Sequence, residues 1–260
     1  MNNETTTNNL ILSSYFSQDV SKKALCVIMP AYNEGAAICN NLLNASSIIS
    51  EFCKDYIIIA VNDGSKDNTE SEIIKASEKD SNIAYISYHQ NKGKGGAIST
   101  GVHYANSTYT AFLDSDLELS PSMLEEFLTQ LEKGNGDIAI GSKLHKESKL
   151  NYPAIRKFLS LGYYLLLKLL FRLKIKDTQT GIKLFKTQVV KPICESLSTY
   201  GFAYDIEILA KATKKGYSII EMPIVLNFSR DEKSKSRFSL KVIIRMFKET
   251  LKVKKAVKQY

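Results

Sequence analysis

The chain has 260 residues, of which 44% are hydrophobic and 24% are charged, so its composition excludes a disordered polypeptide and allows one domain with a large core. The formal net charge is +8, but residues 1–130 carry 8 Lys and Arg against 16 Asp and Glu, whereas residues 131–260 carry 27 against 11. An acidic first half and a basic second half predict a region that handles cations, followed by a surface that faces an anion.

Residues 1–16 are polar and lack the basic stretch and apolar core of a signal peptide, so we expect residues 1–22 to form a loose leader. No uninterrupted apolar run has the roughly 20 residues that a membrane-spanning helix needs. The four cysteines show no paired or metal-binding spacing, which is typical of buried thiols in a reducing compartment. We therefore expect a cytoplasmic protein that associates with membranes peripherally.

Residues 23–236 are predicted to form one α/β domain. Apolar runs predict strands, and the stretches between them have helical spacing. The expected strands cover residues 25–29, 56–61, 83–88, 110–113 and 137–140, and the expected helices cover residues 38–52, 68–79, 96–105 and 122–133. Repeated alternation of strand and helix indicates a mostly parallel sheet with helices on both faces, and such sheets bind ligands beyond the carboxyl ends of their strands.

The second half of the chain has a different periodicity. Residues 152–175 are predicted to form one long helix, in which Lys168 and Arg172 disfavour a membrane span and favour a position at the membrane interface. An ordinary core helix is the alternative. The elements expected after it are a turn at 177–181, a strand at 182–185, a helix at 204–215 and a strand at 217–227.

Residues 237–260 are predicted to form a basic amphipathic tail. Residues 240–257 have helical spacing, and between residues 237 and 258 eight basic residues stand against one acidic residue, Glu249. Basic residues near an anionic membrane each contribute about 1 kcal/mol at best. The tail is therefore interpreted as a contact with an anionic membrane surface, with a solvated helix as the alternative.

Polar and aromatic residues follow the first two predicted strands. Pro30, Tyr32 and Glu34 follow the first strand, and Asp63 follows the second. An aromatic ring can stack on a nucleobase, and a carboxylate can accept hydrogen bonds from a base or a ribose. Each motif alone would also suit a simple turn. Lys94 lies in a glycine-lysine loop before a predicted helix, where backbone amides and lysines can approach phosphate.

The sequence Asp-Ser-Asp follows the fourth predicted strand. Asp114 and Asp116 can share a hard cation with pyrophosphate oxygens, and Glu118 is a candidate third ligand. Mg²⁺ or Mn²⁺ prefers such oxygen ligands and leaves positions for substrate phosphates. A helix cap or an acidic turn is the alternative. The pattern predicts a metal site that stabilises a leaving diphosphate.

The order of these motifs resembles a known family. PAYNE, NDGSKD, NKGKGGA and DSD together are similar to the family-two inverting glycosyltransferases of the GT-A fold, and DTQTGIKLF and YDIE further on resemble dolichyl-phosphate glucosyltransferases. The resemblance implies a GT-A domain over residues 23–236 that moves a hexose from a nucleotide-sugar to a polyprenyl monophosphate. The donor that the resemblance implies first is UDP-glucose. GDP-mannose is the second, because the DSDLELSP stretch and Arg230 are closer to the mannosyl relatives.

The resemblance also implies roles for individual residues. The residues implied to contact the nucleoside or nucleotide are Pro30, Tyr32, Glu34, Asp63 and Lys94. Those implied to bind the metal are Asp114, Asp116 and Glu118. Those implied to bind the donor or acceptor phosphates are Lys143, Arg156, Arg230 and Lys235. Of these, the two aspartates and the two arginines are expected to act in catalysis. The implied partners are a nucleotide-sugar, a polyprenyl phosphate and an anionic membrane, with no nucleic acid. A transferase with a soluble glycan or protein acceptor is the leading alternative, followed by a nucleotidyltransferase and a nucleic-acid-binding protein.

Overall fold

The computed structural model describes residues 10–17, 21–150, 168, 170–171, 173–201, 203–226 and 240–260, with the backbone alone at residues 150 and 240–247. The strands in these ranges are β1 (Ile11–Leu12), β2 (Lys23–Ala31), β3 (Tyr56–Asp63), β4 (Ile83–Tyr88), β5 (Ser107–Phe112), β6 (Ile138–Ser142), β7 (Lys149–Leu150), β8 (Lys183–Lys186), β9 (Ile219–Pro223) and β10 (Val225–Leu226). They form an eight-stranded sheet in the order β1-β4-β3-β2-β5-β8-β6-β9, together with a two-stranded sheet of β7 and β10.

The first half of the large sheet is parallel. Strand β2 lies between β3 and β5, and Cys26 is the register partner of both Ile57 and Thr110. Strand β4 continues the parallel order on the far side of β3. Because all four strands point the same way, the loops that follow β2, β3 and β5 meet at one edge of the sheet. The predicted α/β architecture is confirmed.

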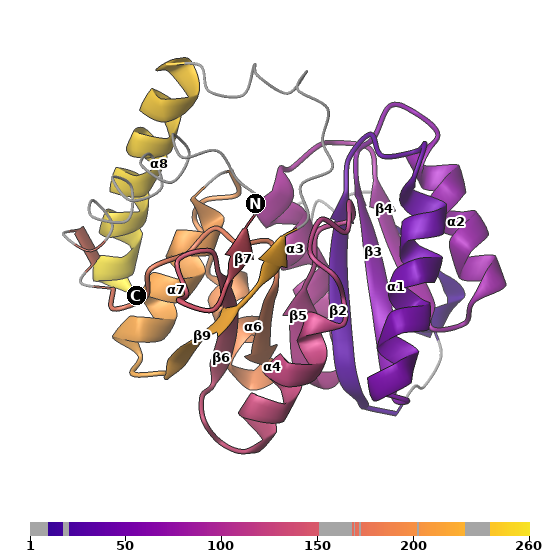
Figure 1. Ribbon diagram of the computed structural model, residues 1–260. Coiled ribbons are helices and arrows are strands. Elements are labelled where there is room, and N and C mark those ends of the chain that lie inside the picture. Colours follow the sequence, from indigo (N-terminus) through magenta and orange to yellow (C-terminus); the bar gives the residue numbers. More distant parts are fainter. Residues whose placement is uncertain are drawn as a thin grey trace.

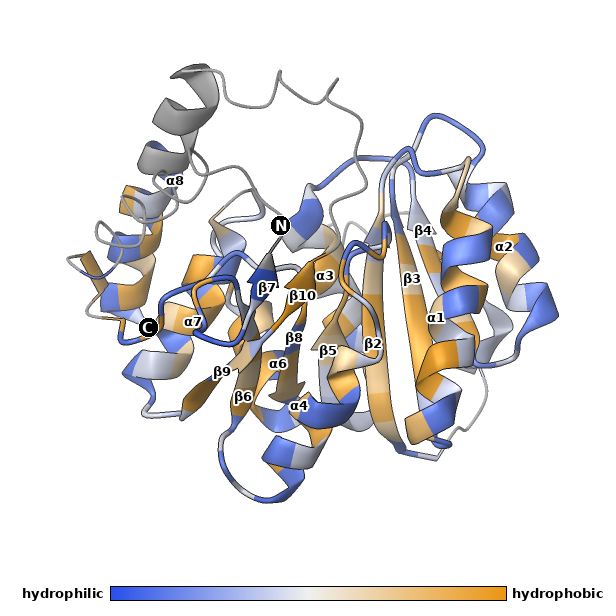
Figure 2. Cartoon of the chain, in the orientation of Figure 1, coloured by the Kyte–Doolittle hydropathy of each residue, from blue (hydrophilic) through white to orange (hydrophobic). Residues whose placement is uncertain are grey.

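Helices cover both faces of this sheet (Figure 1). Residues of β2 alternate between the faces: Val27 and Met29 pack with one set of helices, and Cys26 and Ile28 pack with the other. Figure 2 shows the resulting pattern, with hydrophobic residues along the central strands and hydrophilic residues on the outer sides of the helices. The first face holds α1 (Ile38–Phe52), α2 (Thr69–Lys79) and α4 (Met123–Glu132), and the second holds α3 (Lys94–Tyr104), α6 (Thr187–Glu195) and α7 (Tyr204–Lys214).

The second half of the sheet contains a reversal. Strand β8 lies antiparallel between β5 and β6, so Lys183 is the register partner of Phe112 on one side and Ile140 on the other. The strand predicted over residues 217–227 is divided into β9 and β10, and its last residue, Asn227, lies outside the described residues. The division follows Pro223, after which Ile224 N donates a hydrogen bond to Ser148 Oγ at 3.0 Å instead of continuing the ladder.

Two other expectations differ from the structure. Part of the loose leader expected over residues 1–22 is attached to the sheet, because β1 pairs antiparallel with β4. In the 3₁₀ turn η1 (Ser14–Ser17) that follows, Phe16 meets Tyr104 edge to face, with the ring centroids 5.2 Å apart. The long helix expected over residues 152–175 lies mostly outside the described residues, and residues 173–175 are not helical. Leu173 and Ile175 are buried in the core. No helix in the described part of the chain is long and apolar enough to span a bilayer.

The carboxyl-terminal helix α8 (Leu240–Gln259) packs against α7. Val253 is completely buried in this contact. Lys214 Nζ donates to the carbonyls of Val257 and Lys258, both at 2.8 Å, and the Tyr260 ring lies 4.8 Å from the ammonium of Lys211. One face of the predicted amphipathic tail is therefore occupied by the protein itself. The boundary expected at residue 237 falls outside the described residues.

Candidate active site

The loops that follow β2 and β3 are joined to one another. Asn33 N donates to Ser65 Oγ at 3.0 Å, and Glu34 N donates to Thr69 Oγ1 at 2.8 Å. Asn33 adopts a φ of 54°, a left-handed conformation that asparagine tolerates better than most residues. These bonds fix the PAYNE segment at the edge of the sheet, where Tyr32 is 45% exposed.

Asp63 ends β3 as a buried, fixed carboxylate. Its Oδ1 accepts hydrogen bonds from Tyr88 Oη and from Lys92 N, each at 2.8 Å. Burial raises the pKa of Asp63 above its ordinary value, although both hydrogen bonds favour the ionised form. The neighbouring Asn62 is also buried and donates to Ser87 Oγ at 2.9 Å. The Asp63 carboxylate is therefore fixed in place at the end of β3, and Asn62 supports the turn that follows by accepting a hydrogen bond from Ser65 N at 3.2 Å.

The glycine loop between β4 and α3 is packed closely against the segment before α7. Gly95 N donates to Tyr200 O at 3.0 Å. A Cβ atom on Gly95 would lie only 2.5 Å from Tyr204 Cβ, so no larger residue fits there. Gly93 has a φ of 83°, which glycine adopts without strain. These glycines allow the backbone at the start of α3 to contact the segment before α7. That contact sets the position of Lys94, the first residue of α3.

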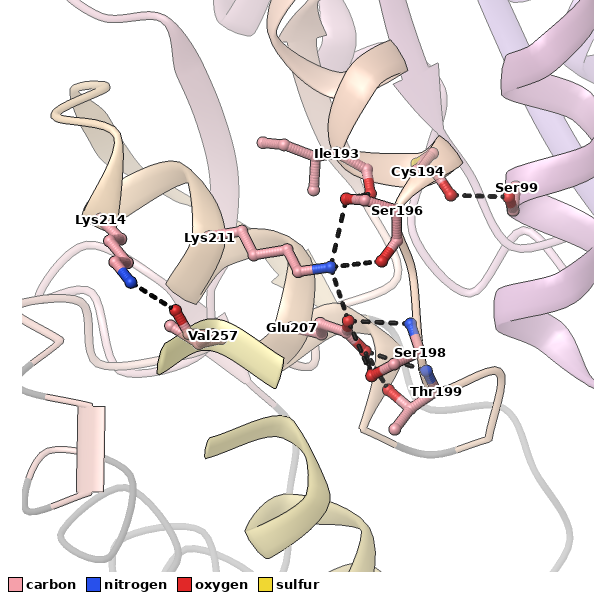
Figure 3. A network of polar contacts seen from close by, with 10 residues as sticks. All are labelled: Ser99, Ile193, Cys194, Ser196, Ser198, Thr199, Glu207, Lys211, Lys214 and Val257. Carbon is pink, nitrogen blue, oxygen red and sulfur yellow. Dashed lines mark hydrogen bonds and ion pairs between the residues drawn. The ribbon is translucent and has the colours of Figure 1, made fainter. Parts of the chain in front are cut away.

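A buried ion pair holds the segment that contacts the glycine loop (Figure 3). Glu207 is fully buried and accepts hydrogen bonds from Ser198 N and Thr199 N, each at 2.9 Å. Lys211 Nζ lies 2.8 Å from Glu207 and donates to Ser196 O at 2.6 Å. Burial alone would raise the pKa of Glu207, but Lys211 and these hydrogen bonds hold it below its usual range. The network secures the residues that lead to Tyr200.

Asp114 and Asp116 lie just beyond β5 and are partly buried. Asn41 Nδ2 donates to Ser115 O at 2.8 Å, which fixes the turn from the side of α1. Lys94 Nζ lies 2.5 Å from Asp114 Oδ1. Burial alone would lower the pKa of Lys94, but the nearby carboxylates, Asp114 foremost, raise it above its ordinary value. A positive charge therefore already sits against the first aspartate of the pair.

The predicted turn at residues 177–181 contacts the same aspartate. A Cβ atom on Gly181 would lie 2.3 Å from Asp114 Oδ2, so the glycine backbone lies directly against that carboxylate. Asp177 Oδ2 accepts from Thr180 Oγ1 at 2.6 Å and from Lys143 N at 2.9 Å. Burial alone would raise the pKa of Asp177, but the Lys143 ammonium, 3.5 Å away, and these bonds hold it below its usual range.

The donor set suits a cation whose coordination is completed by a substrate. Within the described residues, no group of three or more His, Cys, Asp or Glu side chains could hold a metal ion. Glu118 is thus not part of a preformed three-carboxylate cluster with Asp114 and Asp116; its backbone N donates to Asp116 Oδ1 at 3.2 Å. Mg²⁺ is commonly held by one or two carboxylates together with substrate phosphates, so the chemistry of the two aspartates fits such an ion.

The structure gathers most of the expected site residues at one edge. Pro30 lies near the end of β2, Tyr32 and Glu34 follow it, and Asp63 ends the neighbouring β3. Lys94 reaches from α3 to Asp114. Lys143 lies farther along the edge, beyond β6, in its contact with Asp177. Three expected phosphate-binding residues lie outside the described residues: Arg156, Arg230 and Lys235.

One buried ion pair near this edge was not expected from the sequence: the charged atoms of Lys183 and Asp205 lie 2.7 Å apart. The available signal was a lysine inside the otherwise apolar run Ile-Lys-Leu-Phe, which begins one residue before β8. A charged residue at such a position is rarely buried unless it is paired.

A mostly parallel sheet with helices on both faces and a carboxylate pair beyond its central strands defines a glycosyltransferase of the GT-A fold. The chain belongs to glycosyl transferase family 2, whose family model matches residues 26–194. Both the family and the fold expected from the motifs are confirmed.

Curated relatives cover most of the chain. It is 33% identical over 226 residues to the dolichyl-phosphate beta-glucosyltransferase of Saccharomyces cerevisiae, a match that covers 80% of this chain and 68% of the relative. It is 32% identical over 235 residues to the enzyme of the same name from Homo sapiens, a match that covers 84% of this chain and 71% of that relative. The chain thus spans about two thirds of the length of these relatives.

Solved structures share the fold. Glucosyl-3-phosphoglycerate synthase from Mycobacterium tuberculosis, in complex with UDP, superposes with a TM-score of 0.65 at 17% identity, covering 90% of this chain and 80% of that chain. A second structure of that enzyme holds Mn²⁺, UDP and glucosyl-3-phosphoglycerate, with a TM-score of 0.65, 18% identity, and coverage of 89% and 78%. At this level of identity the likeness concerns the fold.

Proposed function

We propose that this glycosyltransferase moves glucose from UDP-glucose to a polyprenyl monophosphate such as dolichyl phosphate, with inversion and with the help of Mg²⁺ or Mn²⁺. The observation that carries the proposal is a link between two carboxylates. Lys92 N donates a hydrogen bond to Asp63, and two residues later Lys94 forms an ion pair with Asp114. A nucleoside site and a diphosphate site are thereby joined by one short loop. The names of the matched relatives support glucose and dolichyl phosphate as substrates.

The donor's nucleoside would lie at the ends of β2 and β3. The exposed ring of Tyr32 offers a stacking surface for the base, and the fixed carboxylate of Asp63 offers an acceptor for a base or ribose donor. Pro30 and Glu34 form the rest of this edge. The loops are already bonded to each other, so little ordering is needed when the nucleoside binds.

The donor's diphosphate would lie beside Asp114 and Asp116. These two carboxylates would hold the divalent ion, with Glu118 as the further candidate, and the ion would supply charge stabilisation for the leaving diphosphate. Lys94 is held beside Asp114 by the ion pair and by the packing of the glycine loop. Its positive charge would then offset the negative charge that develops on the leaving group.

The acceptor phosphate is already anionic at neutral pH, so attack on the anomeric carbon needs no strong general base. The protein must instead bring two anions together, and fixed positive side chains and positioning supply much of the rate. Lys143 is the candidate within the described residues, and its contacts with Asp177 would hold it for this role. The other candidates for phosphate binding, Arg156, Arg230 and Lys235, extend the proposal to residues outside the described ranges.

The surface of α8 would meet the cytoplasmic face of an anionic membrane. Its buried residues face α7, whereas five lysines of its described side chains are exposed. These are Lys248, Lys252, Lys254, Lys255 and Lys258. The proposed attachment is therefore mainly electrostatic and falls with rising salt concentration.

A transfer assay tests the proposal directly. The purified chain is incubated with radiolabelled UDP-glucose or GDP-mannose, dolichyl phosphate in detergent and Mn²⁺, and the lipid product is identified by mass spectrometry. We expect glucosyl phosphoryl dolichol from UDP-glucose. Product from GDP-mannose alone would assign the other hexose, and transfer only to a soluble glycan acceptor would contradict the lipid assignment.

A further inference from the structure

Two side chains outside the proposed donor site form a buried ion pair next to it. Lys183 Nζ lies 2.7 Å from Asp205 Oδ1, and the two side chains are only 2% and 8% exposed. Lys183 is the register partner of Phe112, which precedes Asp114 by two residues. Burying two charges is costly, and a well-packed apolar pair would often be at least as stable. The pair therefore calls for an explanation other than packing.

Lys183 also contacts the turn that supports Asp114. Its Nζ donates a hydrogen bond to Thr180 O at 2.5 Å. The next residue, Gly181, lies so close to Asp114 that an added Cβ atom would come within 2.3 Å of Asp114 Oδ2. One hydrogen bond, one peptide unit and one van der Waals contact therefore connect the Lys183 ammonium to the Asp114 carboxylate.

The other end of the turn is fixed independently. Asp177 accepts hydrogen bonds from Lys143 N at 2.9 Å and from Gln179 N at 3.1 Å. The carbonyl of Thr180 at the near end is held by Lys183. Loss of the Lys183 ammonium would remove this hydrogen-bond donor from the buried carbonyl of Thr180, and an unsatisfied buried carbonyl is energetically costly. The turn would then shift at the end that contacts Asp114.

We propose that Lys183 and Asp205 are positioning residues for the metal-binding carboxylate pair. Asp205 holds the Lys183 ammonium, Lys183 holds the Thr180 carbonyl, and Gly181 then fixes Asp114 at the place where a divalent ion meets the donor diphosphate. The inference rests on the proposed function. A pair that served packing alone would change the stability of the protein and leave its affinity for the ion unaltered.

Two substitutions separate these roles. Lys183→Met removes the ammonium and leaves Asp205 as an unpaired buried charge, so we expect a lower Tm and an Mn²⁺ affinity weakened at least tenfold. The double variant Lys183→Met with Asp205→Leu replaces the pair by apolar side chains, so we expect the Tm to recover toward the wild-type value while the Mn²⁺ affinity stays weak. The Mn²⁺ affinity of each variant is measured by calorimetric titration in the presence of UDP, and its Tm by thermal unfolding.

Lys186→Met is the matched control. Lys186 ends the same strand and also makes an ion pair, with Asp137 at 2.8 Å, but it lies at the opposite end of β8 and is 29% exposed. We expect this variant to bind Mn²⁺ as the wild type does. If the double variant kept the wild-type Mn²⁺ affinity, the positioning role would be overturned. If the wild type itself showed no binding of Mn²⁺ with UDP, the proposed function would fail first, and the inference with it.

Discussion

The contact between Gly181 and Asp114 allows a substitution whose effect follows from geometry. In Gly181→Ala the new Cβ atom would lie 2.3 Å from Asp114 Oδ2, whereas an ordinary van der Waals contact begins at 3.4 Å. The carboxylate or the turn must therefore move by about 1 Å. The flexible carboxylate is the easier of the two to displace, since the turn is anchored through Asp177 and Lys183.

A displacement of about 1 Å at a reacting group commonly costs on the order of 100-fold in rate. We therefore expect kcat/KM for sugar transfer to fall about 100-fold in Gly181→Ala, which corresponds to about 2.7 kcal/mol at the transition state. The Tm should change little, because the carboxylate is partly exposed and can rotate away. The assay is radiolabelled transfer at saturating Mn²⁺, with thermal unfolding measured in parallel.

Gly136→Ala provides the control for adding a methyl group. Gly136 precedes β6 away from the aspartates, and its Cβ would first meet the side-chain atom Ile220 Cγ2 at 3.2 Å. We expect wild-type kcat/KM from this variant. A Gly181→Ala protein with wild-type kcat/KM and wild-type Tm would refute the argument that the position of Asp114 limits the reaction.

Three further predictions concern charge. Asp114→Asn and Asp116→Asn should each lower kcat by at least about 100-fold while circular dichroism shows an intact fold; full transfer activity in either would contradict the metal assignment. Glu207→Gln removes one partner of a buried pair and should lower the free energy of unfolding by about 3–5 kcal/mol in urea titrations. The pKa of Glu207 in the folded protein lies below its ordinary value of 4.5. The stability that ionised Glu207 contributes is therefore complete above pH 4.5 and is lost as the pH falls through the pKa of the folded state. A urea midpoint of the wild type that stays constant from pH 4.5 down through that pKa would contradict this prediction. Replacing Lys252 and Lys255 by alanine should weaken binding to anionic liposomes by up to about 30-fold, at about 1 kcal/mol for each lysine, with an unchanged Tm; unchanged flotation would contradict the membrane role.

The strand ends could be predicted from the sequence because their signals are local. The apolar runs of β2, β3 and β5 end in polar or turn-forming residues, and those residues are the ones that meet at the edge of the sheet. The sequence pattern also predicted Asp114 and Asp116 beyond β5, where the structure has them.

Features that depend on distant partners could not be predicted in this way. The antiparallel strand β8 and the buried pair of Lys183 and Asp205 arise from packing between residues far apart in sequence. The amphipathic pattern of α8 indicates an apolar face but not what covers it, and part of that face packs on α7. Strand β1 has two residues, too few for any periodicity to show.

The central claim is that the aspartate pair holds a divalent ion that binds the diphosphate of a sugar nucleotide. It is tested most directly by measuring the Kd for UDP with and without Mn²⁺, in the wild type and in Asp114→Asn. We predict that Mn²⁺ tightens UDP binding at least tenfold in the wild type and has no effect in the variant. Equal UDP affinity with and without Mn²⁺ in the wild type would contradict the account.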